Sequence, residues 1–175
     1  LADPGSNSVT FSLVSPAGDM GFPGRLLVSA TYRLGDDDSL RITMNAITDE
    51  PTIVNLVHHT YWNLAGQGSG DVRDQHLRLA ADHYTPIDAE LITTGEVAAV
   101  AGTIFDFRSS KAIGQDIDKL GDIGTGDLVG GGYDHNWCLN GGNSGMHLCA
   151  SVSDPASGRG FELLTNEPGV QFYTG

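Results

Sequence analysis

The sequence LLVSATYRLGDDDSLRITMNA, residues 26–46, decides the fold class. Apolar side chains occupy every second position on both sides of an acidic turn: Leu26, Val28, Ala30, Tyr32 and Leu34, then Leu40, Ile42, Met44 and Ala46. This period of two predicts two half-buried strands joined as a hairpin by residues 35–39. Asp36, Asp37 and Asp38 then lie in a solvated turn, because a calcium loop needs spaced oxygen ligands and a glycine at a set position.

Similar strand signals recur along the rest of the chain. Val9, Phe11 and Leu13 alternate with polar residues. Further strands are predicted over residues 53–59, 75–81, 136–139, 146–152, 161–165 and 169–173, and one short helix over residues 110–120. Short strands separated by Gly, Pro and Asp turns favour an antiparallel β-sandwich over βαβ units. No linker divides the chain, so we expect residues 1–175 to form one domain or a large part of one.

The composition excludes several classes of protein. The chain has 175 residues, with 9 Lys and Arg against 22 Asp and Glu, which gives a formal net charge of −13. Such an acidic chain without a basic cluster is a poor partner for nucleic acid or an anionic membrane surface. No apolar run is long enough to span a bilayer. The hydrophobic share of 39% is sufficient for a core and argues against disorder.

The ends and the two cysteines carry less information. Because the chain begins without Met and stops in an apolar run, we expect a fragment that is incomplete at both ends. Cys138 and Cys149 flank a turn, and either form a disulfide across a hairpin or serve as small buried apolar residues, which we favour. No signal in the sequence identifies the cellular compartment, and we favour the cytoplasm. The sequence specifies no oligomeric state.

The segment from Asn55 to Gly66 is the densest in polar and aromatic side chains. Alternation places His59 and Tyr61 on one side of the chain and His58 on the other. Histidine beside aromatic rings suits a sugar, which presents hydroxyls at its rim and C–H groups on its faces, and histidine moves protons near neutral pH. The alternative is a packed core histidine. A shared metal is disfavoured because adjacent strand residues point to opposite sides.

Two later segments supply further hydrogen-bonding groups. In Gly131–Trp137, glycines precede Asp134 at the start of a strand, where its carboxylate either binds sugar hydroxyls or caps its own turn. In Asn166–Gly175, Gln171 and Tyr173 share a face, and Glu167 is expected to be solvated. Motifs of serine hydrolases, P-loop and dinucleotide-binding proteins and zinc proteases are absent from the sequence.

In these segments, and in their order along the chain, the sequence resembles the aldose 1-epimerase family, the galactose mutarotases. The resemblance is carried by residues 54–66, by Gly132-Tyr133-Asp134-His135-Asn136 and by Pro168-Gly169-Val170-Gln171-Phe172-Tyr173-Thr174-Gly175. It implies a large antiparallel β-sandwich and an isomerase that interconverts the α and β anomers of a free monosaccharide such as galactose or glucose. This reaction needs a general acid and a general base on opposite sides of the sugar, and no cofactor or metal.

The resemblance also assigns roles to residues. His59 matches the family's catalytic acid, with His58 where the family usually has Asn and Trp62 where it usually has Phe. Asp134 matches a carboxylate that holds sugar hydroxyls, and Gln171 a further sugar contact. The family's base is a Glu beyond the segment that ends at Gly175, and a first histidine and an arginine precede Leu1. We therefore expect the 175 residues alone to be inactive, and neither Glu162 nor Glu167 matches the base.

Three rival functions follow from the same sequence. A non-catalytic carbohydrate-binding β-sandwich explains the aromatic residues and Asp134 without a base. A sugar-phosphate mutarotase needs cationic residues around its site, which a chain of net charge −13 disfavours. A purely structural sandwich leaves the ordered match unexplained.

Overall fold

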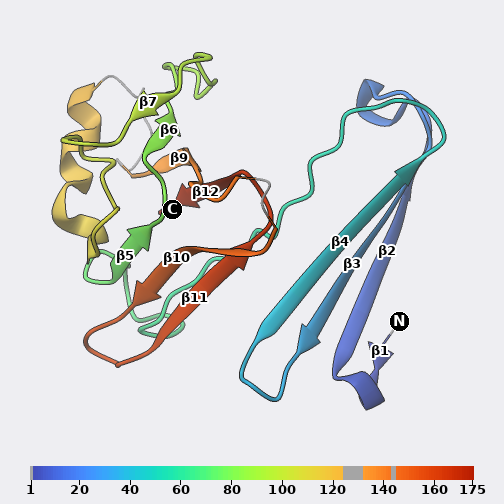
Figure 1. The fold of residues 1–175 in the computed structure, drawn as a ribbon, viewed down its shortest axis with the longest axis horizontal. Helices are drawn as coiled ribbons and strands as arrows, with labels where there is room; N and C mark the ends of the chain where they lie inside the picture. The colour runs from blue at the N-terminus through green and yellow to red at the C-terminus, as the bar shows by residue number, and fades with distance from the viewer. Residues whose placement is uncertain (1, 124–131, 143–144) are drawn as a thin grey trace. The chain divides into compact units, whose positions relative to one another are not determined.

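A computed structural model describes residues 2–123, 132–142 and 145–175. The chain forms antiparallel strands with only short 3-10 helices between them, which confirms the all-β prediction. It divides into two compact units, Leu1–Tyr61 and Trp62–Gly175 (Figure 1). The expectation of one domain stays a prediction. In the described part of the chain, no helix has the length and apolar character needed to cross a membrane.

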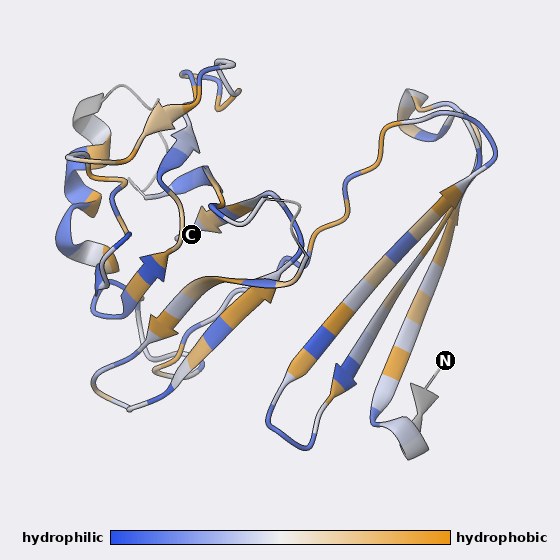
Figure 2. Cartoon of the chain, in the orientation of Figure 1, coloured by the Kyte–Doolittle hydropathy of each residue, from blue (hydrophilic) through white to orange (hydrophobic). Residues whose placement is uncertain are grey.

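The first unit is a sheet with strand order β1-β2-β3-β4. Its elements are β1 (Ala2–Asp3), the 3-10 helix η1 (Pro4–Ser6), β2 (Ser8–Ser15), the 3-10 helix η2 (Asp19–Gly21), β3 (Leu26–Leu34) and β4 (Leu40–Thr48). The predicted hairpin is confirmed, since Ala30 pairs with Met44 and Tyr32 with Ile42. Hydrophobic and hydrophilic residues alternate along most of β4, as the sequence pattern predicts (Figure 2).

The acidic turn between β3 and β4 is held by its own residues. The Asp37 carboxylate accepts hydrogen bonds from the Ser39 backbone N–H at 3.2 Å and from the Ser39 hydroxyl at 2.6 Å. The Gly35 N–H donates to the Ser39 carbonyl at 2.8 Å. This is an Asx-type turn, in which the side chain replaces a backbone acceptor, and it confirms the prediction of a turn.

The strand predicted over residues 53–59 is wrong. The structure assigns no strand or helix to residues 51–63. A strand is defined by its ladder of hydrogen bonds to a neighbour, and in the described chain no other strand pairs with this segment. The sequence pattern indicated an extended backbone, but a pattern in one segment does not report whether a partner strand lies beside it.

The second unit contains two sheets, with orders β11-β10-β5-β8 and β12-β9-β6-β7 (Figure 1). The first sheet consists of β5 (His76–Leu79), β8 (Lys111–Ala112), β10 (His147–Ser153) and β11 (Gly160–Thr165). The second, which we call sheet C, consists of β6 (His83–Thr85), β7 (Ala98–Ala99), β9 (Asp134–Cys138) and β12 (Gly169–Tyr173). The predicted short helix appears as two 3-10 helices, η3 (Ile113–Gln115) and η4 (Ile117–Ile123).

The two cysteines do not face each other across a hairpin. Cys138 lies in β9 of sheet C, and Cys149 lies in β10 of the other sheet, so the turn between them joins two sheets rather than two paired strands. Both are free thiols. Cys149 is fully buried, and burial raises the pKa of its thiol to about 11. Its role as a small buried residue is therefore confirmed, whereas Cys138 is half-buried.

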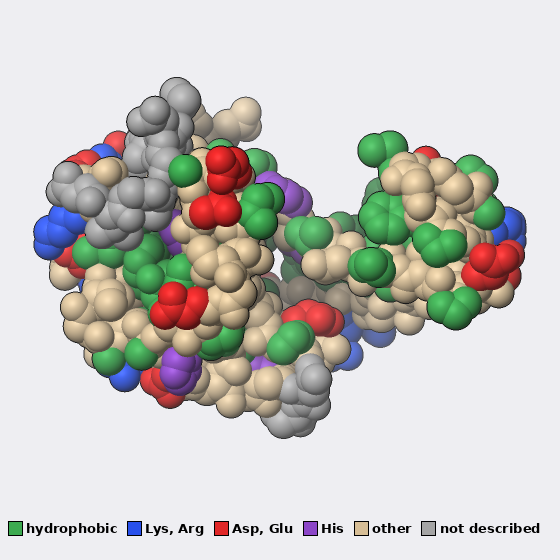
Figure 3. Space-filling model, turned by 90° about the horizontal axis from the view of Figure 1, so that it is seen from above, with side chains coloured by type: hydrophobic (Ala, Val, Ile, Leu, Met, Phe, Trp, Pro, Cys, Tyr) green, Lys and Arg blue, Asp and Glu red, His purple; other side chains and the backbone are tan. Residues whose placement is uncertain are grey.

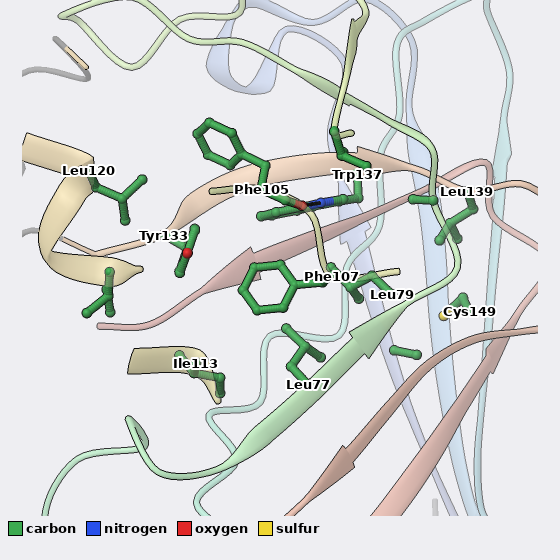
Figure 4. Packing of buried hydrophobic residues seen from close by; sticks show 14 residues of the cluster. Leu77, Leu79, Phe105, Phe107, Ile113, Leu120, Tyr133, Trp137, Leu139 and Cys149 are labelled. Atoms are coloured by element: carbon green, nitrogen blue, oxygen red, sulfur yellow. Dashed lines mark hydrogen bonds between the residues drawn. The ribbon is translucent and has the colours of Figure 1, made fainter. Parts of the chain in front are cut away.

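The core of the second unit draws residues from both sheets and from the loop before β8. Figure 4 shows Phe107 between Leu77 and Leu79 of β5 on one side and Tyr133 and Trp137 on the other. Phe107 makes edge-on ring contacts with Tyr133, Trp137 and Phe172 at centroid distances of 5.2, 6.0 and 5.9 Å. The Lys111 ammonium lies over the Phe107 ring, 4.4 Å from the ring centroid.

Replacing Phe107 by alanine is expected to destabilise this unit strongly. The side chain is 1% exposed, and removing a buried phenyl ring costs about 3–5 kcal/mol through lost transfer energy and the cavity left behind. Urea unfolding of the wild type and of Phe107→Ala measures the difference. Phe22→Ala, at a position 49% exposed, is the matched control with a much smaller expected loss. A loss below about 1 kcal/mol in Phe107→Ala would contradict this packing.

Acidic side chains occur as separate groups over the face shown in Figure 3. Asp106 forms a two-pronged ion pair with Arg108, with Nε–Oδ1 and Nη2–Oδ2 distances of 2.9 and 2.8 Å. The hydrogen bonds from Arg108 lower the pKa of Asp106 from 3.8 to about 2. A second carboxylate, that of Asp82, lies 3.4 Å from the same guanidinium.

This ion pair predicts a pH dependence of stability. Because the folded pKa of Asp106 is lower than its ordinary value, its contribution is complete above about pH 4 and is lost as pH falls towards about 2. The melting temperature should therefore fall more steeply over this window in the wild type than in Asp106→Asn, which has no carboxylate to protonate. Parallel slopes in thermal melts from pH 5 to pH 2 would contradict the role of this pair.

Candidate functional site

His58 and His59 point to different surroundings, as the alternation of the sequence predicts. His58 is half-buried, lies with its ring centroid 5.7 Å from that of Tyr32, and hydrogen-bonds through Nε2 to the Thr60 hydroxyl. His59 is exposed, and its ring lies over that of Tyr61 with a centroid distance of 5.2 Å. The alternation thus survives in an extended loop, and His59 is not a packed core histidine.

Strand β9 presents two chemically different faces. Tyr133, which precedes it, and His135 and Trp137 within it are buried, whereas the alternating residues Asp134 and Asn136 are half-buried. Successive side chains of a strand point to opposite faces, so the inward face is aromatic and the outward face is polar. The inner aromatic residues anchor β9 to the core, and the outer polar residues are partly exposed.

Hydrogen bonds fix β9 at both ends of its inner face. The Tyr133 hydroxyl donates to the Ile104 carbonyl, and Trp137 Nε1–H donates to the Phe105 carbonyl, each at 3.0 Å. Next to the strand, the Tyr133 N–H donates to the Thr174 hydroxyl and the Thr174 N–H to the Tyr133 carbonyl, both at 3.0 Å. Because these buried polar atoms are satisfied, the strand that carries Asp134 is held in one position.

Asp134 and Gln171 are hydrogen-bonded to each other. Asp134 pairs across the ladder with Tyr173, so Gln171, two residues earlier on β12, lies on the same outward face of sheet C. Gln171 Nε2 donates to Asp134 Oδ1 at 2.7 Å. Of the two alternatives for Asp134, its carboxylate contacts this neighbouring strand and caps no backbone N–H of its own turn in the described residues. Among the described residues, no hydrogen bond occupies the other carboxylate oxygen of Asp134 or the amide oxygen of Gln171, so both can act as acceptors.

His135 lies on the opposite, inner side of the same strand. Its side chain is 1% exposed and packs against the ring of Phe105, with a centroid distance of 4.7 Å. Burial lowers the pKa of His135, and the neighbouring Asp134 carboxylate opposes this effect in part. No role for this residue was predicted from the sequence, because the strand was expected to begin only at residue 136, whereas β9 begins at Asp134.

The other candidate groups lie apart from this pair. Glu162 is exposed on β11, which belongs to the other sheet, and Glu167 is exposed in the turn before β12. Trp62 packs on Phe161, with a centroid distance of 5.3 Å. Within the described ranges, no three His, Cys, Asp or Glu side chains are grouped so as to hold a metal ion.

The structure therefore brings together two of the three predicted site residues. Asp134 and Gln171 are partners in the second unit, and His59 belongs to the first. The convergence of His59 with the other two stays a prediction. A hydrogen-bond network that was not predicted from the sequence follows His59 in the chain: the buried Gln75, 3% exposed, donates from Nε2 to Oδ1 of the half-buried Asn63 at 2.8 Å. Asn63 in turn donates to the Gly70 carbonyl at 3.0 Å.

Comparison with known proteins gives a consistent result. The family model described as Aldose 1-epimerase matches residues 2–175. Galactose mutarotase of Homo sapiens is 45% identical over 170 residues, which cover 97% of this chain and 47% of that protein. Aldose 1-epimerase of Escherichia coli strain K12 is 38% identical over 175 residues, which cover 100% of this chain and 49% of that protein. The chain thus spans about half the length of these curated relatives.

Solved structures agree with the sequence relatives. An aldose epimerase homologue from C. elegans superposes with a TM-score of 0.80 at 28% identity, over 95% of this chain and 48% of that one. Galactose 1-epimerase from Lactobacillus acidophilus NCFM gives a TM-score of 0.69 at 36% identity, over 83% of this chain and 41% of that one. The galactose mutarotase-like β-sandwich expected from the sequence is therefore confirmed.

Proposed function

Because the chain belongs to the aldose 1-epimerase family, we propose that the protein containing it interconverts the α and β anomers of a free aldohexose such as galactose or glucose. His59 is the general acid, Asp134 holds sugar hydroxyls, and Gln171 makes a further sugar contact. The observation that carries this proposal is the Asp134–Gln171 pair on the outward face of sheet C, on a strand anchored from below.

The chemistry of this face suits an uncharged sugar. A carboxylate and an amide side by side accept and donate hydrogen bonds, as a ring bearing several hydroxyls requires. The strands of sheet C, all within the described residues, contain no Lys or Arg. A phosphorylated sugar would meet the negative charge of Asp134 without compensation from these strands, so a free monosaccharide is the better substrate.

The proposed reaction is a proton relay through the open-chain sugar. A general base takes the proton of the anomeric hydroxyl while protonated His59 gives a proton to the ring oxygen. The bond between C1 and the ring oxygen breaks, and the aldehyde forms. Rotation about the C1–C2 bond followed by reclosure yields the other anomer, and the protons return. Histidine suits the acid because its ordinary pKa lies near neutral pH, and its exposure at position 59 gives a sugar access to the ring.

The base is not assigned to a residue between 1 and 175. Glu162 lies in the sheet that does not carry Asp134, and Glu167 precedes Pro168 in an exposed turn. In the proposal, a residue outside this chain completes the acid–base pair. Neither a metal nor an organic cofactor has a step in this reaction.

Polarimetry tests the proposal directly. Freshly dissolved α-galactose or α-glucose, with catalytic amounts of the full-length protein, is expected to reach its equilibrium rotation many times faster than in buffer. Sugar binding without acceleration would instead indicate a carbohydrate-binding module. Acceleration with galactose 6-phosphate but not with galactose would favour the sugar-phosphate alternative.

A further inference from the structure

His135 is a polar group buried in an aromatic environment. Its ring centroid lies 4.7, 6.2 and 6.3 Å from those of Phe105, Tyr84 and Trp137, respectively. An imidazole costs more to bury than an apolar side chain of the same size unless its polar atoms are bonded. Tyr133 and Trp137, which flank it on the inner face, use their polar atoms to bind the Ile104 and Phe105 carbonyls. The imidazole of His135 instead contacts the backbone of the preceding residue, Asp134.

His135 Nδ1 accepts a hydrogen bond from the backbone N–H of Asp134, with an N–N distance of 3.2 Å. Tyr133 exchanges its hydrogen bonds with Thr174, beside β12, so the next residue, Asp134, directs its N–H to the opposite side. On that side β6 pairs with β9 only at residues 136–138. Asp134 thus lies beyond the end of β6, where its N–H has no acceptor from the ladder, and His135 supplies one.

We propose that His135 is a positioning residue for Asp134. By accepting the Asp134 N–H, it holds the end of β9 in the extended conformation from which the carboxylate reaches Gln171 and the sugar. Without this acceptor the strand end would turn its N–H towards water, and the carboxylate would move with it. The kinetic consequence rests on the proposed function, whereas the structural consequence does not.

Two variants of His135 separate positioning from packing. His135→Asn keeps an acceptor two bonds from Cβ, as in imidazole Nδ1, but loses volume; His135→Leu keeps most of the volume but has no acceptor. In the full-length protein we expect Leu to raise KM for galactose about three- to tenfold and Asn to change it less than about twofold, with kcat nearly constant in both. The free energy of unfolding should fall more in His135→Asn than in His135→Leu, because Asn leaves the larger cavity.

A control and a direct readout complete the test. Leu79→Ala removes a buried side chain from β5, in the sheet that does not carry Asp134, and should lower stability without changing KM. In ¹⁵N-labelled wild-type protein, His135 should carry its proton on Nε2, and exchange of the Asp134 amide with deuterium should be slow in the wild type and His135→Asn but fast in His135→Leu.

These outcomes distinguish the failure of each idea. A proton on His135 Nδ1, equal amide exchange in both variants, or KM values that follow the order of stability would overturn the positioning role. If the protein binds galactose without epimerising it, the dissociation constant replaces KM. If it binds no sugar, the proposed function fails, while the tautomer and the amide exchange still decide the role of His135.

Discussion

Replacing His59 by alanine is expected to lower kcat for mutarotation by at least ~10² while the protein stays folded. In the proposed reaction this imidazole protonates the ring oxygen as the ring opens, and alanine has no proton to give. The side chain is exposed and contacts Tyr61, so its removal leaves no cavity in the core. Polarimetry at saturating galactose measures kcat, and thermal melts of the same preparations report folding.

The neighbouring histidine provides the matched control. His58 contacts Tyr32 and Thr60 instead of facing the same side as His59, so His58→Asn should keep kcat within a few-fold of the wild type. If His59→Ala retained most of its kcat, His59 would not be the acid. If both variants lost activity equally, the effect would belong to the conformation of the loop rather than to one proton donor.

Replacing Asp134 by alanine is the second large expected effect, and it acts on binding. A carboxylate that accepts hydrogen bonds from sugar hydroxyls contributes about 1.5–3 kcal/mol, which corresponds to a roughly 10- to 150-fold loss of kcat/KM. Asn136→Ala removes a polar side chain from the same face of the same strand and should change kcat/KM less than about threefold. Equal losses in the two variants would contradict a specific role for Asp134.

The hydrogen bond between Asp134 and Gln171 predicts that their effects are coupled. Residues in direct contact give double-mutant coupling energies of about 0.5–3 kcal/mol, whereas distant residues behave additively. Because Gln171 Nε2 lies 2.7 Å from Asp134 Oδ1, we expect a coupling energy in the range for residues in direct contact. The loss of kcat/KM in Asp134→Ala combined with Gln171→Ala should therefore be smaller than the product of the two single losses. Strict additivity would mean that the amide does not support the carboxylate.

Much of the fold follows from local pattern, and the errors have one physical origin. The hairpin of residues 26–46 and β12 at residues 169–173 are as predicted, because alternation and turn residues are properties of one segment. The strand expected at residues 53–59 and the hairpin between Cys138 and Cys149 are not found, because both depend on which segment lies alongside. Pairing is set by the whole chain, and a segment alone carries little information about it.

As with the fold, part of the candidate site could be predicted from the sequence. The residues were found through the family resemblance, and the shared face of Asp134 and Gln171 follows from the strand period once β9 and β12 are paired. The role of His135 was hidden, because the lack of a ladder acceptor for Asp134 appears only where β6 ends. The Gln75–Asn63 contact was missed for the same reason, since it joins residues separated by a loop.

A crystal structure of the full-length protein with galactose bound would show whether His59, Asp134 and Gln171 act on one sugar. We expect one pocket in which the His59 imidazole lies within hydrogen-bonding distance of the ring oxygen, while Asp134 and Gln171 contact hydroxyls of the same sugar. A galactose bound elsewhere, or a pocket that contains Asp134 and Gln171 with His59 on a separate surface, would contradict it.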